Sequence, residues 1–208
     1  MKIKAVILIL CMTILIGCNE DNPVTPSPPP NPIEKKYWQG IPHAKAFDNL
    51  QLIQSLERHW RRDTVLFYIH GGIELNGTIS NGSAWYYIFG KIKDNIETNY
   101  DWYAWDNGKI ELGDIGPPIK SNPVAELGPF LKINSDQAIQ LARQNGAKSY
   151  VQHHPHAQVR IDYIFKWSIP AIFMKFSDPD QIGECEPEWW IRSDTGEFLY
   201  TDYQYCHE

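Results

Sequence analysis

Two short segments of this chain carry residues that could act as acid catalysts. Asp-Thr-Gly at 194–196 matches the tripeptide of aspartic proteases, in which two carboxylates share one proton. Asp-Asn-Gly at 106–108 offers a second carboxylate. Both segments separate strand-like runs, and Asp, Asn and Gly are residues that form tight turns. The pattern therefore favours two hairpin turns. No nucleophile, base and orienting group come together by spacing elsewhere, so we expect a protein that is not an enzyme.

Histidines are candidates for a metal site. His154 and His156 lie two residues apart in a predicted strand at 150–164, so their side chains would share one face. Two imidazoles hold zinc or copper weakly, and a complete site needs a third or fourth ligand that no spacing supplies. Pro155 indicates a sheet edge or a bulge, so an exposed polar edge is the favoured interpretation. We expect no metal ion and no other cofactor.

Aromatic residues suggest a binding surface. Strand alternation puts Tyr100 and Trp102 on one face of their strand and Tyr103 and Trp105 on the other. One helix covers only one face of a sheet. The second face therefore either packs inside the protein or is exposed and binds a peptide, or alternatively a small ligand or a glycan, because large exposed aromatic patches are uncommon without a role. The candidate binding residues are Trp85, Tyr103, Trp105, Trp189 and Trp190.

The N-terminal segment indicates how the protein is exported and held. Two lysines precede the apolar stretch 5–16, which is about 18 Å long as a helix and too short for a hydrocarbon layer of about 30 Å. This is typical of a cleaved signal peptide. Leu-Ile-Gly-Cys at 15–18 resembles the lipobox of bacterial lipoproteins. The resemblance implies cleavage after Gly17 and lipid attachment to Cys18, which anchors the protein outside the cytoplasm.

The residue after the cysteine and the charge of the chain narrow the location and the partners. Asn19, in place of an aspartate, favours the outer membrane in the sorting pattern of enterobacteria. The chain has 19 Lys and Arg and 25 Asp and Glu, and loss of residues 1–17 removes two lysines, which leaves a net charge of −8. Nucleic-acid binding requires clustered cations. Nucleic acid is therefore excluded as a partner.

Two further features concern the stalk and the cysteines. The polar stretch 19–36 holds six prolines, which predicts an extended, mobile stalk. Outside the cytoplasm Cys185 and Cys206 are expected to form a disulfide, worth about 2–4 kcal/mol. A two-residue loop at 195–196 would place these two cysteines opposite each other in a hairpin, whereas a three-residue loop with a bulge would shift the register by one residue.

The folded part is predicted to contain two copies of one unit. Helical spacing covers 47–60, and a second helix starts at Asn134, where Gln137 completes a capping box. The turn glycines Gly108 and Gly196 lie 88 residues apart, and the two helices have the same offset. The predicted strands are 65–75, 84–91 and 100–105 in the first copy and 150–164, 167–176 and 188–193 in the second.

The expected fold is therefore α+β, with two tandem units in which a helix covers an antiparallel sheet of three or four strands. The segments at 133–142 and 189–199 resemble the helix and the closing strand of PepSY-type domains. The resemblance implies a non-catalytic, cystatin-like module that binds a protein or peptide, such as a secreted peptidase or another envelope protein. The insertion at 177–184 departs from that pattern. The expected segments are a signal peptide at 1–17, a lipidated cysteine and linker at 18–36, a first unit at 37–115, a linker at 116–131 and a second unit at 132–208.

Overall fold

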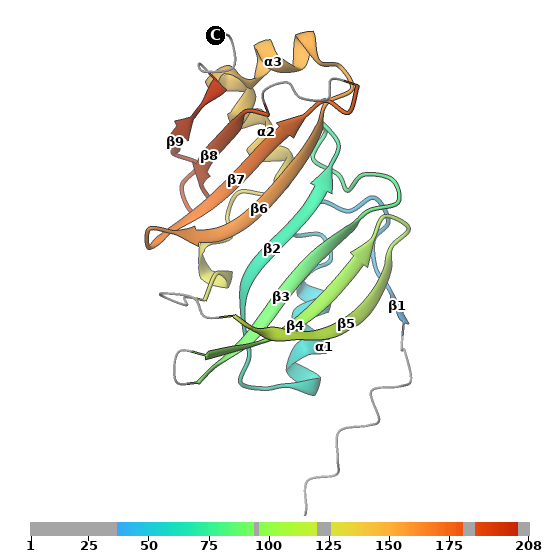
Figure 1. Ribbon diagram of the computed structural model, residues 1–208. Helices are drawn as coiled ribbons and strands as arrows, with labels where there is room; N and C mark the ends of the chain where they lie inside the picture. Colours follow the sequence, from blue (N-terminus) through green and yellow to red (C-terminus); the bar gives the residue numbers. More distant parts are fainter. Residues whose placement is uncertain (1–36, 94–95, 120–125, 181–185, 204–208) are drawn as a thin grey trace, which may run out of the picture. The chain divides into compact units, whose positions relative to one another are not determined.

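The computed structural model describes residues 37–93, 96–119, 126–180 and 186–203. Nine strands in these ranges join one antiparallel sheet in the order β1-β5-β4-β3-β2-β6-β7-β8-β9 (Figure 1). The strands are β1 Tyr37–Gln39, β2 Val65–Ile73, β3 Ala84–Lys93, β4 Ile96–Trp105, β5 Lys109–Ile119, β6 Gln158–Lys166, β7 Ile169–Ser177, β8 Glu188–Arg192 and β9 Phe198–Thr201.

The prediction of two tandem units with separate sheets is wrong. Strand β2 pairs with β3 on one side and with β6 on the other, so that Ile69 opposes both Tyr87 and Tyr163. An edge strand carries a row of unpaired N–H and C=O groups, and pairing β2 with β6 satisfies both rows. The sheet also reaches beyond the expected first unit, because β5 continues to Ile119.

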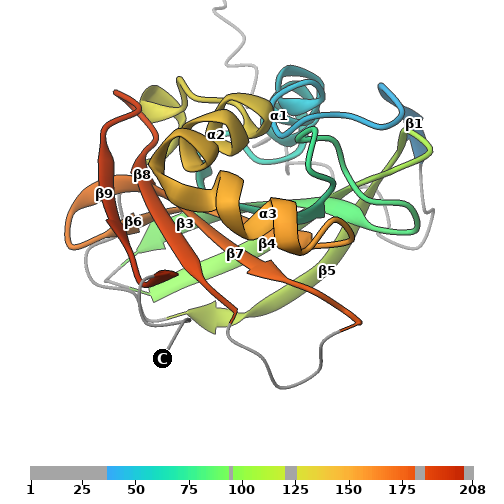
Figure 2. The same ribbon diagram turned by 90° about the horizontal axis from the view of Figure 1, so that it is seen from above.

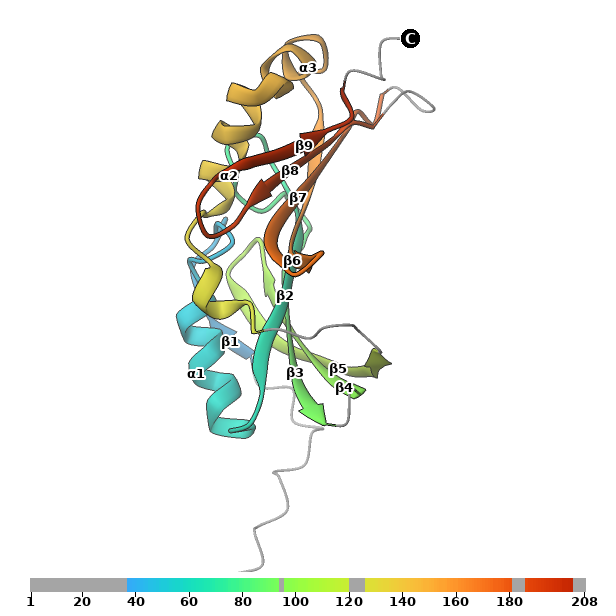
Figure 3. The same ribbon diagram turned by 90° about the vertical axis from the view of Figure 1, so that its left-hand side faces the viewer.

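All the helices of the described residues lie on one face of this sheet, as Figures 2 and 3 show. They are α1 Leu50–Trp60, α2 Ser135–Ala142 and α3 Lys148–His153, together with the short helix η1 Gly128–Phe130 and the irregular turn η2 Arg143–Ala147. One row of side chains beneath them crosses the sheet and is fully buried. It contains Trp102, Tyr87, Ile69, Tyr163, Ile172 and Ile191.

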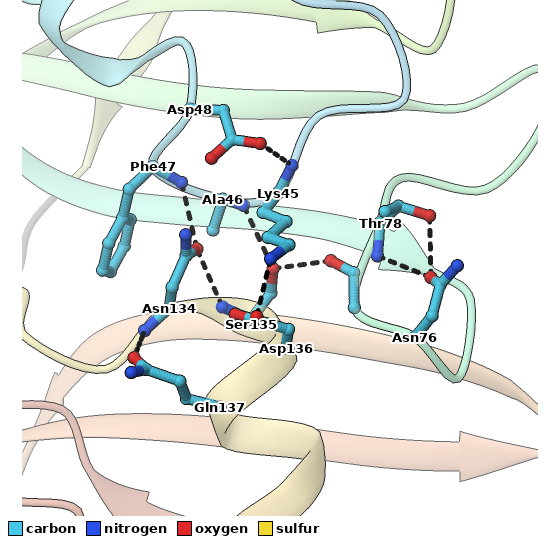
Figure 4. A network of polar contacts seen from close by, with 11 residues as sticks. Lys45, Ala46, Phe47, Asp48, Asn76, Thr78, Asn134, Ser135, Asp136 and Gln137 are labelled. Atoms are coloured by element: carbon cyan, nitrogen blue, oxygen red, sulfur yellow. Dashed lines mark hydrogen bonds and ion pairs between the residues drawn. The ribbon is translucent and has the colours of Figure 1, made fainter.

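The start of α2 connects to segments far away in the chain (Figure 4). The predicted capping box is confirmed, because Asn134 and Gln137 make its reciprocal bonds. The buried Ser135 hydroxyl donates to the carbonyl of Gly77 at 2.6 Å and accepts from the backbone N–H of Ala46 at 3.1 Å. These bonds tie the β2–β3 loop and the segment before α1 to α2, and so hold the helix layer together.

Two local predictions differ from the structure. The predicted strand at 150–164 begins as helix α3, because Gly146 turns the chain with a φ of 104° and a new helix then starts. Strand β6 starts only at Gln158. In the β8–β9 hairpin, Trp189 opposes Thr201, which is one residue away from the register that places the two cysteines opposite each other. Cys185 and Cys206 lie outside the described residues, and their disulfide stays a prediction.

Candidate functional site

No helix in the described ranges covers the second face of the sheet, which we call the open face (Figure 3). A single row of side chains crosses this face through all nine strands. Register pairs link its members one by one from β1 to β9, so they share the same face. In sheet order the row consists of Tyr37, Glu111, Tyr103, Tyr86, His70, Asp162, Phe173, Trp190 and Tyr200. We call it the cross-sheet row.

The rings in one half of the cross-sheet row pack on one another. His70 stacks on Tyr86 with ring centroids 4.3 Å apart, and also on Tyr68, its neighbour on β2, at 5.1 Å. Tyr86 then meets Tyr103 edge-on at 4.9 Å. Trp105 lies beside Tyr103 and donates its indole N–H to Glu111 at 2.7 Å. These contacts hold the half-buried rings in fixed positions on the face.

A polar group occupies the centre of the row. Asp162, only 4% exposed, accepts a hydrogen bond from the Tyr68 hydroxyl at 2.9 Å and one from Nε of Arg160 at 3.1 Å. Burial, followed by the charge of Asp162, raises the pKa of Tyr68 to about 12, so the phenol remains a proton donor at neutral pH. The charge of Asp162 raises the pKa of Arg160. Burial lowers the pKa of His70, although Asp162 opposes that shift.

A second aromatic group lies at the other end of the face. Trp190 packs against Phe173 with centroids 4.7 Å apart and against Trp167 at 6.3 Å. The ammonium of Lys166 lies 5.0 Å from the Trp167 ring and 5.3 Å from the Trp190 ring. Trp167 occupies the turn between β6 and β7 and is 77% exposed.

The structure separates the five aromatic residues predicted to bind a ligand. Trp85 and Trp189 are fully buried beneath the helices, and their indoles donate to backbone carbonyls at 2.9 Å. Tyr103, Trp105 and Trp190 lie on the open face. The predicted alternation along β4 is confirmed, because Trp102 is buried on the helix side while Tyr103 packs against an open-face ring.

The open-face residues do not converge on one narrow groove. Tyr103 on β4 and Trp190 on β8 are separated by four strands. At a strand spacing of about 4.8 Å this places them about 24 Å apart. The arrangement is a broad surface on which aromatic rings flank a charged centre. It offers contact area and hydrogen-bonding groups.

Asp194 among the candidate acids and His154 among the candidate metal ligands have structural partners. Asp194 lies in the predicted hairpin turn and receives two bonds from the Arg192 guanidinium at 2.9 and 2.8 Å, which lower the pKa of its carboxyl. His154 stacks on Tyr150 and pairs with Asp178 at 3.1 Å. His156 is exposed in the turn before β6. Within the described ranges, no three His, Cys, Asp or Glu side chains come close enough to hold a metal ion.

The centre of the open face was not predicted from the sequence. Tyr68, His70, Arg160 and Asp162 come together only because β2 pairs with β6. Polar and apolar residues alternate along the start of β6, which is a signal that Arg160 and Asp162 share a face. No local pattern shows which strand lies beside them.

Comparisons with known proteins place the chain in no family. No family matches it, and no curated protein matches it. The resemblance to PepSY-type domains is therefore not supported by a match to a family model. The chain is similar to a solved crystal structure, that of a candidate lipoprotein from Clostridium difficile 630, with a TM-score of 0.48 and 11% identity over 78% of this chain and 94% of the other. None of the helices in the described ranges has the length and apolar composition of a membrane span.

Proposed function

We propose that this chain is a lipid-anchored protein of the bacterial cell envelope that binds a protein partner through the open face and catalyses no reaction. A secreted peptidase or another envelope protein is the partner class. The observation that carries the proposal is the cross-sheet row, which places aromatic rings from β1 to β9 on a face without a helix.

The size of the row supports a protein rather than a small molecule. The seven longer strands, β2 to β8, extend over about 34 Å at about 4.8 Å each, and three same-face positions on each of them cover about 20 Å. The resulting area of about 700 Å² is close to what one partner contributes to a protein–protein interface of standard size. Tyr, Trp and Arg are also the residues that dominate binding energy in such interfaces.

The chemistry of the face supports binding without catalysis. The Asp162 carboxylate is held by Tyr68 and Arg160, and Asp194 is held by Arg192. A catalytic acid or base needs a free proton site within reach of a substrate. In the described ranges these carboxylates instead position neighbouring side chains.

The membrane anchor is supported by the sequence at 1–18, where an apolar stretch of signal-peptide length ends at Cys18. Those residues lie outside the described ranges. Mass spectrometry of the membrane fraction tests this part: the mature chain should begin at Cys18 and carry acyl groups. A mature chain that begins elsewhere, or carries no lipid, would contradict it.

Site-specific photo-crosslinking in the cell envelope tests the partner. A benzophenone at Tyr86 or Tyr103 should crosslink one defined protein, whereas the same group at Leu52, which is 37% exposed on α1, should not. With the purified partner, Tyr86→Ala should weaken binding at least tenfold and Leu52→Ala should not. Crosslinks from Leu52 alone, or equal affinities for both variants, would exclude the open face as the binding surface.

A second candidate function is glycan binding, favoured by one observation. Trp167 leaves 77% of its surface exposed beside Trp190 and so offers ring area for stacking. Titration with soluble peptidoglycan fragments, followed by tryptophan fluorescence, tests this function. A saturable response that disappears in Trp167→Ala would support a glycan ligand in place of a protein.

A further inference from the structure

The turn between β6 and β7 has a backbone conformation that its residues do not favour. Lys166 pairs with Ile169, so the loop consists of Trp167 and Ser168 alone. Their φ angles are 51° and 64°. Two-residue hairpin loops with positive φ at both positions strongly prefer Asn-Gly or related pairs. A bulky residue such as tryptophan at positive φ is a genuine outlier.

The packing of the hairpin uses little of the tryptophan at this position. Trp167 is 77% exposed, the largest exposed fraction among the bulky apolar residues of the described ranges. Strained residues of this kind cluster at functional sites. The indole therefore points to a contact made outside the folded chain.

The surroundings of the tip combine apolar rings with a cation. Phe130, which is 37% exposed on η1, packs on Phe165 near the end of β6 with centroids 5.5 Å apart. Lys166 lies over the indole and has no carboxylate within ion-pair distance in the described ranges. Indole rings settle at the headgroup level of a bilayer, where a neighbouring lysine reaches lipid phosphates.

We infer that the β6–β7 tip inserts Trp167 into the headgroup region of the bilayer in which the chain is anchored, an inference that rests on the proposed lipid anchor. The tip is a convex two-residue turn, and such a shape enters a fluid layer without needing a matching pocket. The contact fixes the orientation of the sheet relative to the membrane.

The length of chain before the sheet allows this contact. Residues 19–36 provide 18 residues between Cys18 and the start of β1 at Tyr37. A flexible segment of this length spans about 25 Å and an extended Pro-rich one about 56 Å. Trp167 lies about 29 Å from Tyr37 at the start of β1, because Asp162 in the same cross-sheet row is five strand spacings away (about 24 Å) and Trp167 follows Asp162 by five residues (about 17 Å). The tip therefore comes within reach of the bilayer, and insertion becomes an intramolecular step that needs little affinity of its own.

Fluorescence quenching in vesicles tests the inference. The mature lipidated chain is reconstituted in phosphatidylcholine vesicles, with and without bromine on the acyl chains, because bromine quenches a nearby indole. A second sample carries an N-terminal histidine tag in place of Cys18 and is held by nickel-chelating lipid. The comparison variant is Trp167→Asn with Ser168→Gly, which suits the turn, and the control is Ile41→Ala, 51% exposed in the loop after β1.

Brominated lipid should quench on the order of one eighth of the total tryptophan emission in both samples, because Trp167 is one of eight tryptophans in the chain. This loss disappears in the double variant and persists in Ile41→Ala. Unquenched Trp167 in both samples overturns the inference and assigns the indole to a protein or glycan contact. If the lipidated chain does not stay on the vesicles, the anchor proposal fails, while the tagged sample still decides whether Trp167 inserts.

Discussion

Replacement of the β6–β7 loop by Asn-Gly should stabilise the protein. Non-glycine residues in the left-handed region cost about 1–2 kcal/mol each, so Trp167 and Ser168 together store about 3 kcal/mol. Asn and Gly tolerate this conformation. The double variant Trp167→Asn with Ser168→Gly therefore removes most of the strain and changes no residue of the core.

The stabilising interactions that the same double substitution removes are worth slightly less than this strain. Trp167 buries only the remaining quarter of its surface, about 55 Å², which contributes about 1.4 kcal/mol. Its contact with the Lys166 ammonium adds about 0.5 kcal/mol, and glycine adds an entropic cost of about 0.7 kcal/mol. The net gain is about 0.5 kcal/mol, which corresponds to a rise in Tm of about 1–2 °C for a domain of this size.

Urea unfolding, followed by circular dichroism, measures this change, and Trp167→Ala is the matched control. Alanine loses the contacts of the indole but keeps an unfavourable residue at positive φ, so it should lower the free energy of unfolding by about 1.5–2 kcal/mol. The two variants thus differ by about 2 kcal/mol with opposite signs. If the Asn-Gly variant is the less stable of the two, the strain at the tip is not real and the functional reading of Trp167 loses its basis.

Three further predictions concern the rest of the domain. Gly77→Ala should lower the free energy of unfolding by at least about 2 kcal/mol, because Gly77 has a φ of 86° and a Cβ there would lie 2.4 Å from the backbone of α2. Gly82→Ala is the control and should cost only about 1 kcal/mol, because Gly82 has a φ of 72° but no atom within 4 Å of the added Cβ. Equal losses of stability in urea unfolding would contradict the close contact at Gly77. Trp102→Phe should lower the free energy of unfolding by about 1–3 kcal/mol, because the indole N–H donates at 2.7 Å to the buried carboxylate of Glu57. A loss of less than about 0.5 kcal/mol, which is the scatter of neutral surface substitutions, would show that this hydrogen bond adds little stability. Burial lowers the pKa of His70 below its ordinary 6.5, so the unfolded chain binds a proton first and stability falls as the pH drops through 6.5. His70→Gln should lose less stability between about pH 7 and pH 5.5, and thermal melts with the same pH slope in both proteins would refute this.

Much of the local structure could be predicted because it depends on neighbouring residues. The capping box of Asn134 and Gln137 needs groups three residues apart, and the turns at Gly108 and Gly196 need only a residue that accepts positive φ. The alternation along β4 follows from the period of a strand. The helix α3 was missed because its six residues, with exposed Lys148 and His153 and a single buried residue, Tyr150, give no apolar period.

The candidate site could not be predicted to the same degree. The individual aromatic residues were visible, but Trp85 and Trp189 are buried on the helix side of the sheet, whereas Tyr103 and Trp190 lie on the open face. Which of the two faces of a strand is buried depends on the helix that packs against it. The two-residue period of a strand shows which residues share a face, but it does not show which face the helices cover.

Most helices and strands, the turns at Gly108 and Gly196, the acidic charge and the predicted anchor at Cys18 follow from the amino-acid sequence alone, because each depends on adjacent residues or on composition. The pairing of β2 with β6 depends on tertiary packing; it brings His70 opposite Asp162 and joins side chains of all nine strands in one row, in which seven strands contribute an aromatic ring. Backbone hydrogen bonds between strands are the same for every sequence, so the choice of neighbour depends on how the whole helix layer packs over the sheet.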